Sequence, residues 1–183
     1  MNEDAFFRIR IYITAIVFLA IWSLLTWNYF HGGVPSHSIL AREDMPSISN
    51  WWGAVLLPSL TWSLLYRIQK RITDHPTEKQ TALKPPIGIV YRFVGALLFG
   101  IVLSIFFTLR MEEIPGYMVM SLFGLALFIP IYRAECLLGF VMGMTFTFGA
   151  VLPTGIGSIF VLIGAVLYWL VRKALKLVGY KSN

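Results

Sequence analysis

The chain has 183 residues, of which 57% are hydrophobic and only 13% are charged, and its formal net charge is +6. A soluble domain usually carries about 25% charged residues, so this composition excludes an ordinary water-soluble protein. Six apolar stretches are long enough, or nearly long enough, to cross a bilayer as helices of roughly 20 residues. The sequence therefore predicts an all-α, polytopic membrane protein with a single six-helix transmembrane domain over residues 1–183.

The six predicted spans are separated by two long connections. In chain order the spans are residues 9–30, 51–66, 87–109, 115–132, 136–152 and 154–171. Residues 31–50 form an outer loop, and residues 67–86 form a polar, basic cytoplasmic loop. The first span lacks a small-residue cleavage site after it, so we interpret it as a retained helix and not as a signal peptide.

Basic residues in short loops face the cytoplasm, and their distribution predicts the orientation. Of the 15 Lys and Arg residues, only Arg42 and Arg110 would lie outside if both termini were cytoplasmic. We therefore expect both termini inside, in a bacterial inner membrane or, for a eukaryotic chain, in the endoplasmic reticulum. The basic residues are scattered over short loops, which argues against nucleic-acid binding and favours contact with anionic lipid headgroups.

The outer loop carries the side chains that most resemble catalytic or metal-binding groups: His31, His37, Glu43 and Asp44. A zinc enzyme generally needs three protein ligands in a firm geometry, whereas these histidines lie on a loop broken by Gly and Pro, without an HExxH framework. We therefore expect no metal and no cofactor. This loop supports one alternative function: a membrane-embedded, lipid-modifying enzyme in which the four side chains converge.

Two stripes of small residues, each headed by a charge, lie on the third and fifth predicted spans. Steps of four residues give Arg92, Ala96, Gly100 and Ser104 on one, and Glu135, Gly139, Gly143 and Thr147 on the other. Small residues at this spacing let helix backbones approach closely in a membrane. Because an unpaired charge costs about 2.5–3.5 kcal/mol at mid-membrane, we predict that these spans pack in parallel, with Arg92 paired to Glu135.

Arg133 lies two residues before Glu135, so the two side chains cannot face each other on one helix. The bulky side that Arg133 heads is expected to face lipid, with the guanidinium reaching a phosphate group. Together Arg92, Arg133, Glu135, Gly139 and Gly143 are the candidate binding residues. They form either a clamp between two helices or a site for a lipid headgroup or an ion.

Prolines suggest a second alternative, a small-solute transporter or channel. Pro58, Pro130 and Pro153 are expected to interrupt or end the second, fourth and fifth spans, and broken helices line the substrate sites of many transporters. However, no acidic residue lies at mid-membrane, where a proton- or sodium-coupled carrier would normally need one.

The layout of the charged and aromatic residues resembles that of the Insig family, the insulin-induced gene proteins and their bacterial relatives. Trp51–Trp52 opens the second span well after Arg10, Arg92 lies near the start of the third, and Arg133 precedes a "GFVMG" helix. The resemblance implies a six-helix bundle with a lipid- or sterol-receiving cavity and no catalytic residues. Eukaryotic members of the family retain sterol-regulated membrane proteins through their helices. Where the family has an acid before the arginine, this chain has Tyr132, so partner recognition does not carry over.

The leading functional hypothesis is a non-enzymatic membrane protein with a regulatory role. It would bind a diacylglycerol- or sterol-like lipid in a cavity among its helices, because the sequence shows small-residue stripes and lacks a catalytic constellation. The expected partners are membrane lipids, with a second copy of the chain or another membrane protein as further candidates.

Overall fold

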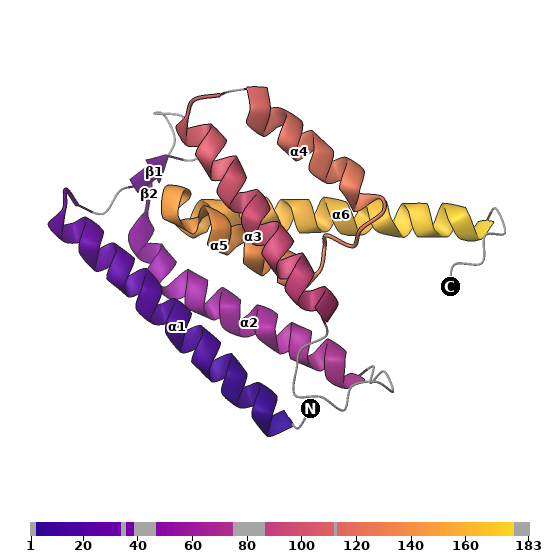
Figure 1. The fold of residues 1–183 in the computed structure, drawn as a ribbon, viewed down its shortest axis with the longest axis horizontal. Helices are drawn as coiled ribbons and strands as arrows, with labels where there is room; N and C mark the ends of the chain where they lie inside the picture. The colour runs from indigo at the N-terminus through magenta and orange to yellow at the C-terminus, as the bar shows by residue number, and fades with distance from the viewer. Residues whose placement is uncertain (1–2, 34–35, 39–46, 75–86, 112, 178–183) are drawn as a thin grey trace.

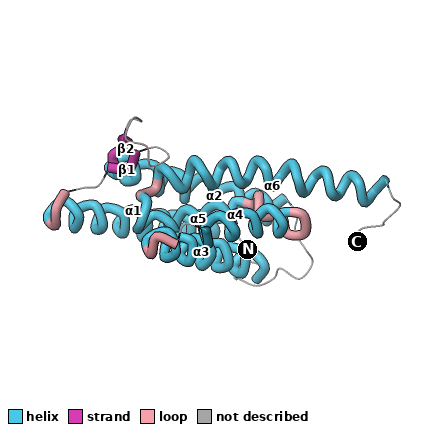
Figure 2. Tube along the Cα trace, turned by 90° about the horizontal axis from the view of Figure 1, so that it is seen from above, coloured by secondary structure: helices cyan, strands magenta, loops and turns pink. Residues whose placement is uncertain are grey.

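A computed structural model, shown in Figure 1, describes residues 3–33, 36–38, 47–74, 87–111 and 113–177. Its six α-helices are α1 (Glu3–Phe30), α2 (Gly53–Asp74), α3 (Ile87–Thr108), α4 (Glu113–Ala126), α5 (Ala134–Phe148) and α6 (Val151–Leu177). A short antiparallel ribbon of β1 (Ser36–Ser38) and β2 (Ser47–Ser49) precedes α2. Figure 2 shows this ribbon at one end of the molecule and the end of α6 at the other. The predicted helical fold class is confirmed.

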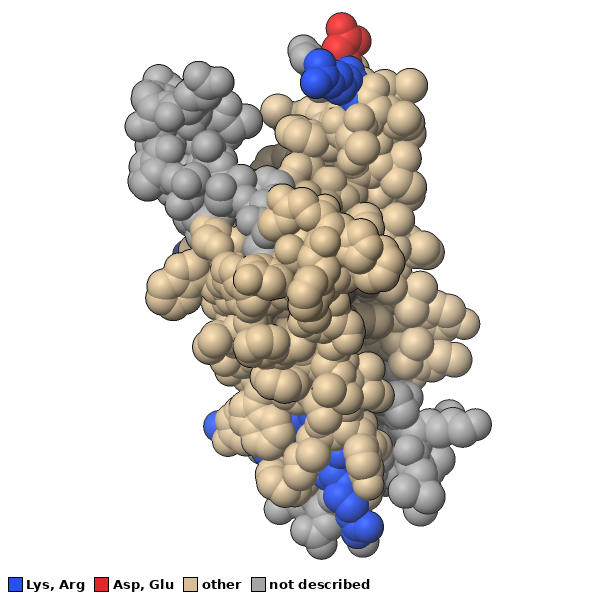
Figure 3. Space-filling view, turned by 90° about the vertical axis from the view of Figure 1, so that its left-hand side faces the viewer, with Lys and Arg blue, Asp and Glu red and all other residues tan. Residues whose placement is uncertain are grey.

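Three helical segments are long and apolar enough to cross a membrane: Ala5–Phe30, Ile87–Thr108 and Val151–Leu175. Ala134–Phe148 is also apolar but shorter. Within Ile87–Thr108, only 17% of an 18-residue apolar stretch is buried inside the protein. On the face drawn in Figure 3, charged atoms gather towards the two ends and the belt between them is uncharged. An apolar surface of this extent is compatible with a membrane location.

The second helix is longer than predicted. The predicted span ended at residue 66, but α2 continues to Asp74, so the expected cytoplasmic loop is helical over residues 67–74, and its remainder, 75–86, lies outside the described residues. The helix also continues through Pro58, which was expected to interrupt it. A helix can continue through a proline where neighbouring helices and local adjustments satisfy the freed backbone groups.

The last three helices also differ from the predicted spans in their boundaries. Residues 127–133 form turns between α4 and α5, so the span predicted over 115–132 ends early, at Ala126. Gly149 separates α5 from α6 with φ +69° and ψ −179°, a combination that is essentially restricted to glycine. Pro153, expected to end the fifth span, lies instead in the first turn of α6, where its missing N–H leaves no hydrogen bond unmade.

Helix α5 lies at the centre of the fold. It packs against α2, α3 and α6, and Figure 1 shows it behind α3 and between α2 and α6. The bulky face headed by Arg133 was expected to meet lipid, which is wrong: Leu137, Phe140, Val141 and Met144 are all buried. The face is covered because α5 has helices on several sides, and periodicity along one helix does not reveal how many neighbours surround it.

Candidate functional site

The seam between α3 and α5 is made by glycines that meet the backbone of the other helix. A methyl group at Gly139 would collide with the carbonyl oxygen of Phe93, and one at Gly143 with that of Leu97. A Cβ at Gly100 would in turn lie 2.8 Å from the Phe140 carbonyl oxygen. Residue numbers rise together along both helices, so α3 and α5 are parallel and in contact through their small residues, as predicted.

Glu135 lies in the first turn of α5 and is completely buried. Arg92 Nη1 lies 3.5 Å from Glu135 Oε1, which confirms the predicted pair. Arg71 on α2 is closer, because its Nη2 lies 2.9 Å from both carboxylate oxygens. Charge-assisted hydrogen bonds are strongest at about 2.7–2.9 Å, so Arg71 is the main partner and Arg92 the weaker one. The carboxylate therefore joins α2, α3 and α5.

The role of Arg71 was missed because α2 was expected to end before it. A signal was nevertheless present in the sequence. Buried positions on α2 recur at helical spacing as Leu57, Thr61, Leu64 and Ile68, and the next step of three reaches Arg71. This face continues past residue 66 without a change of period, and it predicts a helix that carries Arg71 on its buried side.

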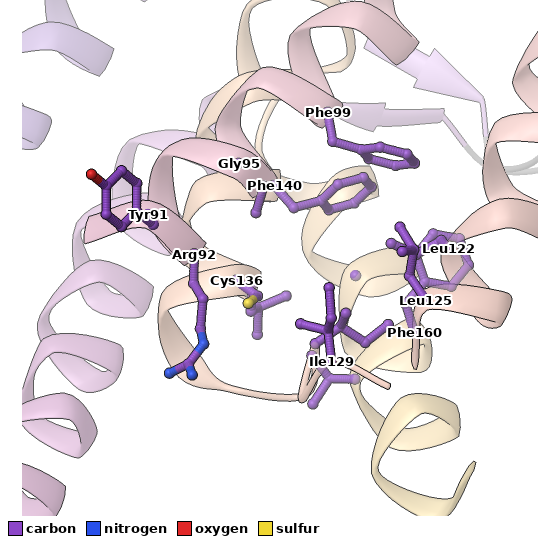
Figure 4. A pocket seen from close by; sticks show the side chains of 15 residues that line it. Tyr91, Arg92, Gly95, Phe99, Leu122, Leu125, Ile129, Cys136, Phe140 and Phe160 are labelled. Carbon is purple, nitrogen blue, oxygen red and sulfur yellow. The ribbon is translucent and has the colours of Figure 1, made fainter. Parts of the chain in front are cut away.

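A cavity of about 360 Å³ lies beside the ion pair. Its walls come from α3, α4, α5, α6 and the α4–α5 turn: Tyr91, Arg92, Gly95, Ala96, Phe99, Leu122, Leu125, Ile129, Ile131, Cys136, Leu137, Phe140, Gly157, Phe160 and Val161. Figure 4 shows Arg92 and Cys136 near one end, with Phe99 towards the other. Ligand pockets usually measure about 300–1,000 Å³ and have apolar walls with few polar groups, and this cavity fits that description.

Among the candidate binding residues, only Arg92 lines this cavity. Gly139 and Gly143 face the backbone of α3 and hold the seam. Arg133 is half-buried at the N-cap of α5 and makes no capping hydrogen bond through its side chain. The structure thus brings Arg92 and Glu135 together and assigns the glycines to packing, while the reach of Arg133 to a phosphate stays a prediction.

Arg10 on α1 is a buried cation at a separate site that the sequence did not reveal. Its side chain stacks on Trp62, with 4.0 Å between Cζ and the ring centroid, and it also lies near the rings of Phe7 and Tyr66. Arg10 Nη1 donates to Gln69 Oε1 at 3.3 Å. Nε is buried without a partner among the described residues. Aromatic faces and one amide thus surround this cation.

The outer-loop candidates are only partly described. The His31 ring stacks on Trp27 with 3.9 Å between ring centroids, and its Nδ1 lies 2.9 Å from the Trp27 carbonyl oxygen. His37 belongs to β1, where its backbone pairs with Ile48. Glu43 and Asp44 lie outside the described residues, so the convergence of these four side chains stays a prediction.

No protein-family model, curated protein or solved structure matches this chain significantly. The resemblance to the Insig family therefore rests on the spacing of charged and aromatic residues alone and stays a prediction.

Proposed function

We propose that the chain is a non-enzymatic integral membrane protein that binds a lipid in the cavity between α3, α4, α5 and α6. The observation that carries this proposal is the cavity itself. It is about 360 Å³ in volume, and its walls are almost entirely apolar, with Tyr91, Arg92 and Cys136 as the lining residues that carry polar groups. A site of this kind suits a molecule with an apolar body and one polar end, such as a diacylglycerol- or sterol-like lipid.

The proposed topology has six spans with both termini in the cytoplasm of a bacterial cell, or of a eukaryotic cell whose endoplasmic reticulum holds the protein. Figure 1 supports an alternating arrangement, because the helices run in opposite directions in turn. The starts of α1 and α3 and the ends of α2 and α6 lie towards one side, and Arg8, Arg71, Arg92 and Lys173 belong to these segments. Positive charge on one side favours that side as cytoplasmic.

The helical hydroxyl groups that bond within their own helix favour a lipid site over a solute pathway. Several donate to carbonyl oxygens of their own helix at 2.6–2.8 Å, namely Thr61, Ser63, Thr145 and Ser158. A hydroxyl group bonded in this way is satisfied without water or solute. The broken-helix argument for a transporter is also weaker than expected, because α2 continues through Pro58.

The proposal can be tested by filling the cavity. Gly95 lines it, and a Cβ built there has nothing within 4 Å, so Gly95→Leu adds a bulky apolar side chain at the cavity wall without a clash at its Cβ. Gly88 on the same helix is equally unobstructed and is not a lining residue, so Gly88→Leu is the matched control. Bound lipid is measured by native mass spectrometry on protein purified in mild detergent.

We expect about one lipid per protein in the wild type and in Gly88→Leu, and little or none in Gly95→Leu. Two results would overturn the proposal: a Gly95→Leu protein that retains the wild-type amount of lipid, or a wild-type protein that neither carries nor takes up lipid.

A further inference from the structure

The cationic end of the cavity carries more positive than negative charge. Arg71 and Arg92 both contact one carboxylate, that of Glu135, and Arg92 also lines the cavity. Among the charged side chains that the structure describes in this contact, two cations therefore face one anion. Charge interactions are strong where water is scarce, so such an excess favours the binding of an anion.

Arg92 supplies the part of this excess that lines the cavity. Arg71 already neutralises Glu135 at 2.9 Å, whereas Arg92 touches the same carboxylate only at 3.5 Å. A guanidinium has five N–H donors, and within the described residues this long contact is the one hydrogen bond that Arg92 makes. Its side chain is 31% exposed and lines the cavity. Arg92 therefore has donors left for a ligand.

The rest of the cavity wall narrows the choice of headgroup. Its lining residues include no Asp or Glu, so a cationic headgroup would meet no negative charge there and would be repelled by Arg92. A neutral hydroxyl could accept one hydrogen bond but would leave the charge unbalanced. A carboxylate or phosphate would accept two N–H groups and neutralise the guanidinium.

We infer that the cavity selects lipids with an acidic headgroup, a carboxylate or a phosphate, bound by Arg92 at the cytoplasmic end with the acyl chain between α3, α4 and α6. This inference rests on the proposed function, because it names the lipid class for the same cavity. Within that function, an acidic lipid takes the place of the neutral diacylglycerol- or sterol-like ligand expected from the sequence.

The test compares probes that share one acyl chain and differ in headgroup. Oleate, oleoyl lysophosphatidate and oleyl alcohol are titrated into delipidated wild-type protein at fixed detergent concentration and alkaline pH, with dioleoylglycerol and cholesterol as further neutral probes. A charge-assisted hydrogen-bond pair predicts at least about tenfold tighter binding of one acidic probe than of oleyl alcohol. The tighter of the two acids distinguishes a carboxylate from a phosphate ligand.

Arg92→Gln should remove most of this preference by weakening the binding of the acidic probe much more than that of oleyl alcohol, because Arg71 still holds Glu135. Arg8→Gln removes an exposed charge on α1 and should change neither affinity. Equal binding of acid and alcohol, tighter binding of a neutral probe, or an unchanged preference in Arg92→Gln would overturn the inference. The first two readouts need only the wild type, so they hold even if the variant is unstable. Failure of every probe to bind would overturn the proposed function itself.

Discussion

Arginine side chains pack between helices in two regions, and their surroundings differ. At the α1–α2 contact, Arg10 is 8% exposed and lies against the rings of Phe7, Trp62 and Tyr66, and no carboxylate reaches it among the described residues. At the α2–α3–α5 contact, two arginines meet the fully buried Glu135. The first region disperses a charge over aromatic faces and the second neutralises it with a fixed partner.

The two clusters therefore have different roles: the Arg10 cluster contributes to helix packing, and the Glu135 cluster fixes helix positions. A cation over an aromatic face is held over a range of positions, and such a contact contributes about 0.5–2 kcal/mol. A buried carboxylate tolerates little displacement from its partners, because an unpaired buried charge is strongly unfavourable. The Glu135 cluster therefore fixes the relative positions of three helices, including α3 and α5, which form two walls of the cavity. The Arg10 cluster stabilises one helix pair without fixing the cavity.

The largest expected loss of stability comes from adding a side chain where α3 and α5 are in closest contact. Gly139→Ala places a methyl group against the carbonyl oxygen of Phe93 and 3.0 Å from the backbone nitrogen of Leu97. Backbone cannot move aside as a side chain can, so we expect a loss of about 3 kcal/mol or more. Thermal unfolding in detergent measures it. Gly124→Ala, with nothing near the added Cβ, should match or exceed the wild type, and equal stability of the two variants would refute the tight seam.

The second-largest loss of stability is expected from removing the carboxylate of Glu135. Glu135→Gln leaves Arg71 and Arg92 without an anion, and we expect a loss of about 2 kcal/mol. This value is less than the 3–5 kcal/mol typical of a broken buried pair because both arginines are about one-third exposed. Denaturant unfolding in mixed micelles measures the loss. A neutral or stabilising Glu135→Gln would show that the cluster does not hold the helices together.

A third experiment ranks the two arginines. Double-mutant cycles that combine Glu135→Gln with Arg71→Gln or Arg92→Gln should give a coupling energy about 1 kcal/mol larger for Arg71, because its hydrogen bonds are 2.9 Å long and that of Arg92 is 3.5 Å. A larger coupling for Arg92 would contradict the described geometry.

The smallest effect is expected at the aromatic site. Arg10→Met replaces a buried guanidinium, one of whose donors lacks a partner, with an apolar side chain of similar length. Loss of the Trp62 contact and relief of desolvation roughly offset each other, so the stability should change by less than about 1 kcal/mol. Unfolding is measured under the conditions used for Glu135→Gln. A loss as large as that of Glu135→Gln would remove the distinction between the two regions.

Much of the α3–α5 seam could be predicted from sequence. Gly139 and Gly143 lie four residues apart on one small-residue stripe, and Gly100 lies on the stripe that faces it. Charge is rare in the predicted spans, so Arg92 and Glu135 were an obvious pair. Periodicity along one helix identifies a face but does not identify every helix that meets it. The covered bulky face of α5 was therefore predicted incorrectly, and Arg71 was missed.

Helix ends and the cavity depend on tertiary contacts. The end of α5 is set by Gly149, where an added Cβ would collide with the side chain of Asn50, far away in sequence. The cavity walls come from four helices and one turn. No local sequence pattern indicates that Phe99, Leu122 and Phe160 face one another. The sequence could therefore predict that a cavity exists but not where it lies.

The central claim, that the space between α3, α4, α5 and α6 holds a lipid, is tested most directly by photo-crosslinking. A fatty acid with a diazirine in its chain is bound, excess probe is removed, and the adducts are mapped by peptide mass spectrometry. The account predicts adducts on cavity residues such as Phe99, Leu122 and Phe160, and their loss in Gly95→Leu. Adducts confined to outward-facing residues such as Ile16, Leu19 and Leu162, unchanged in Gly95→Leu, would contradict it.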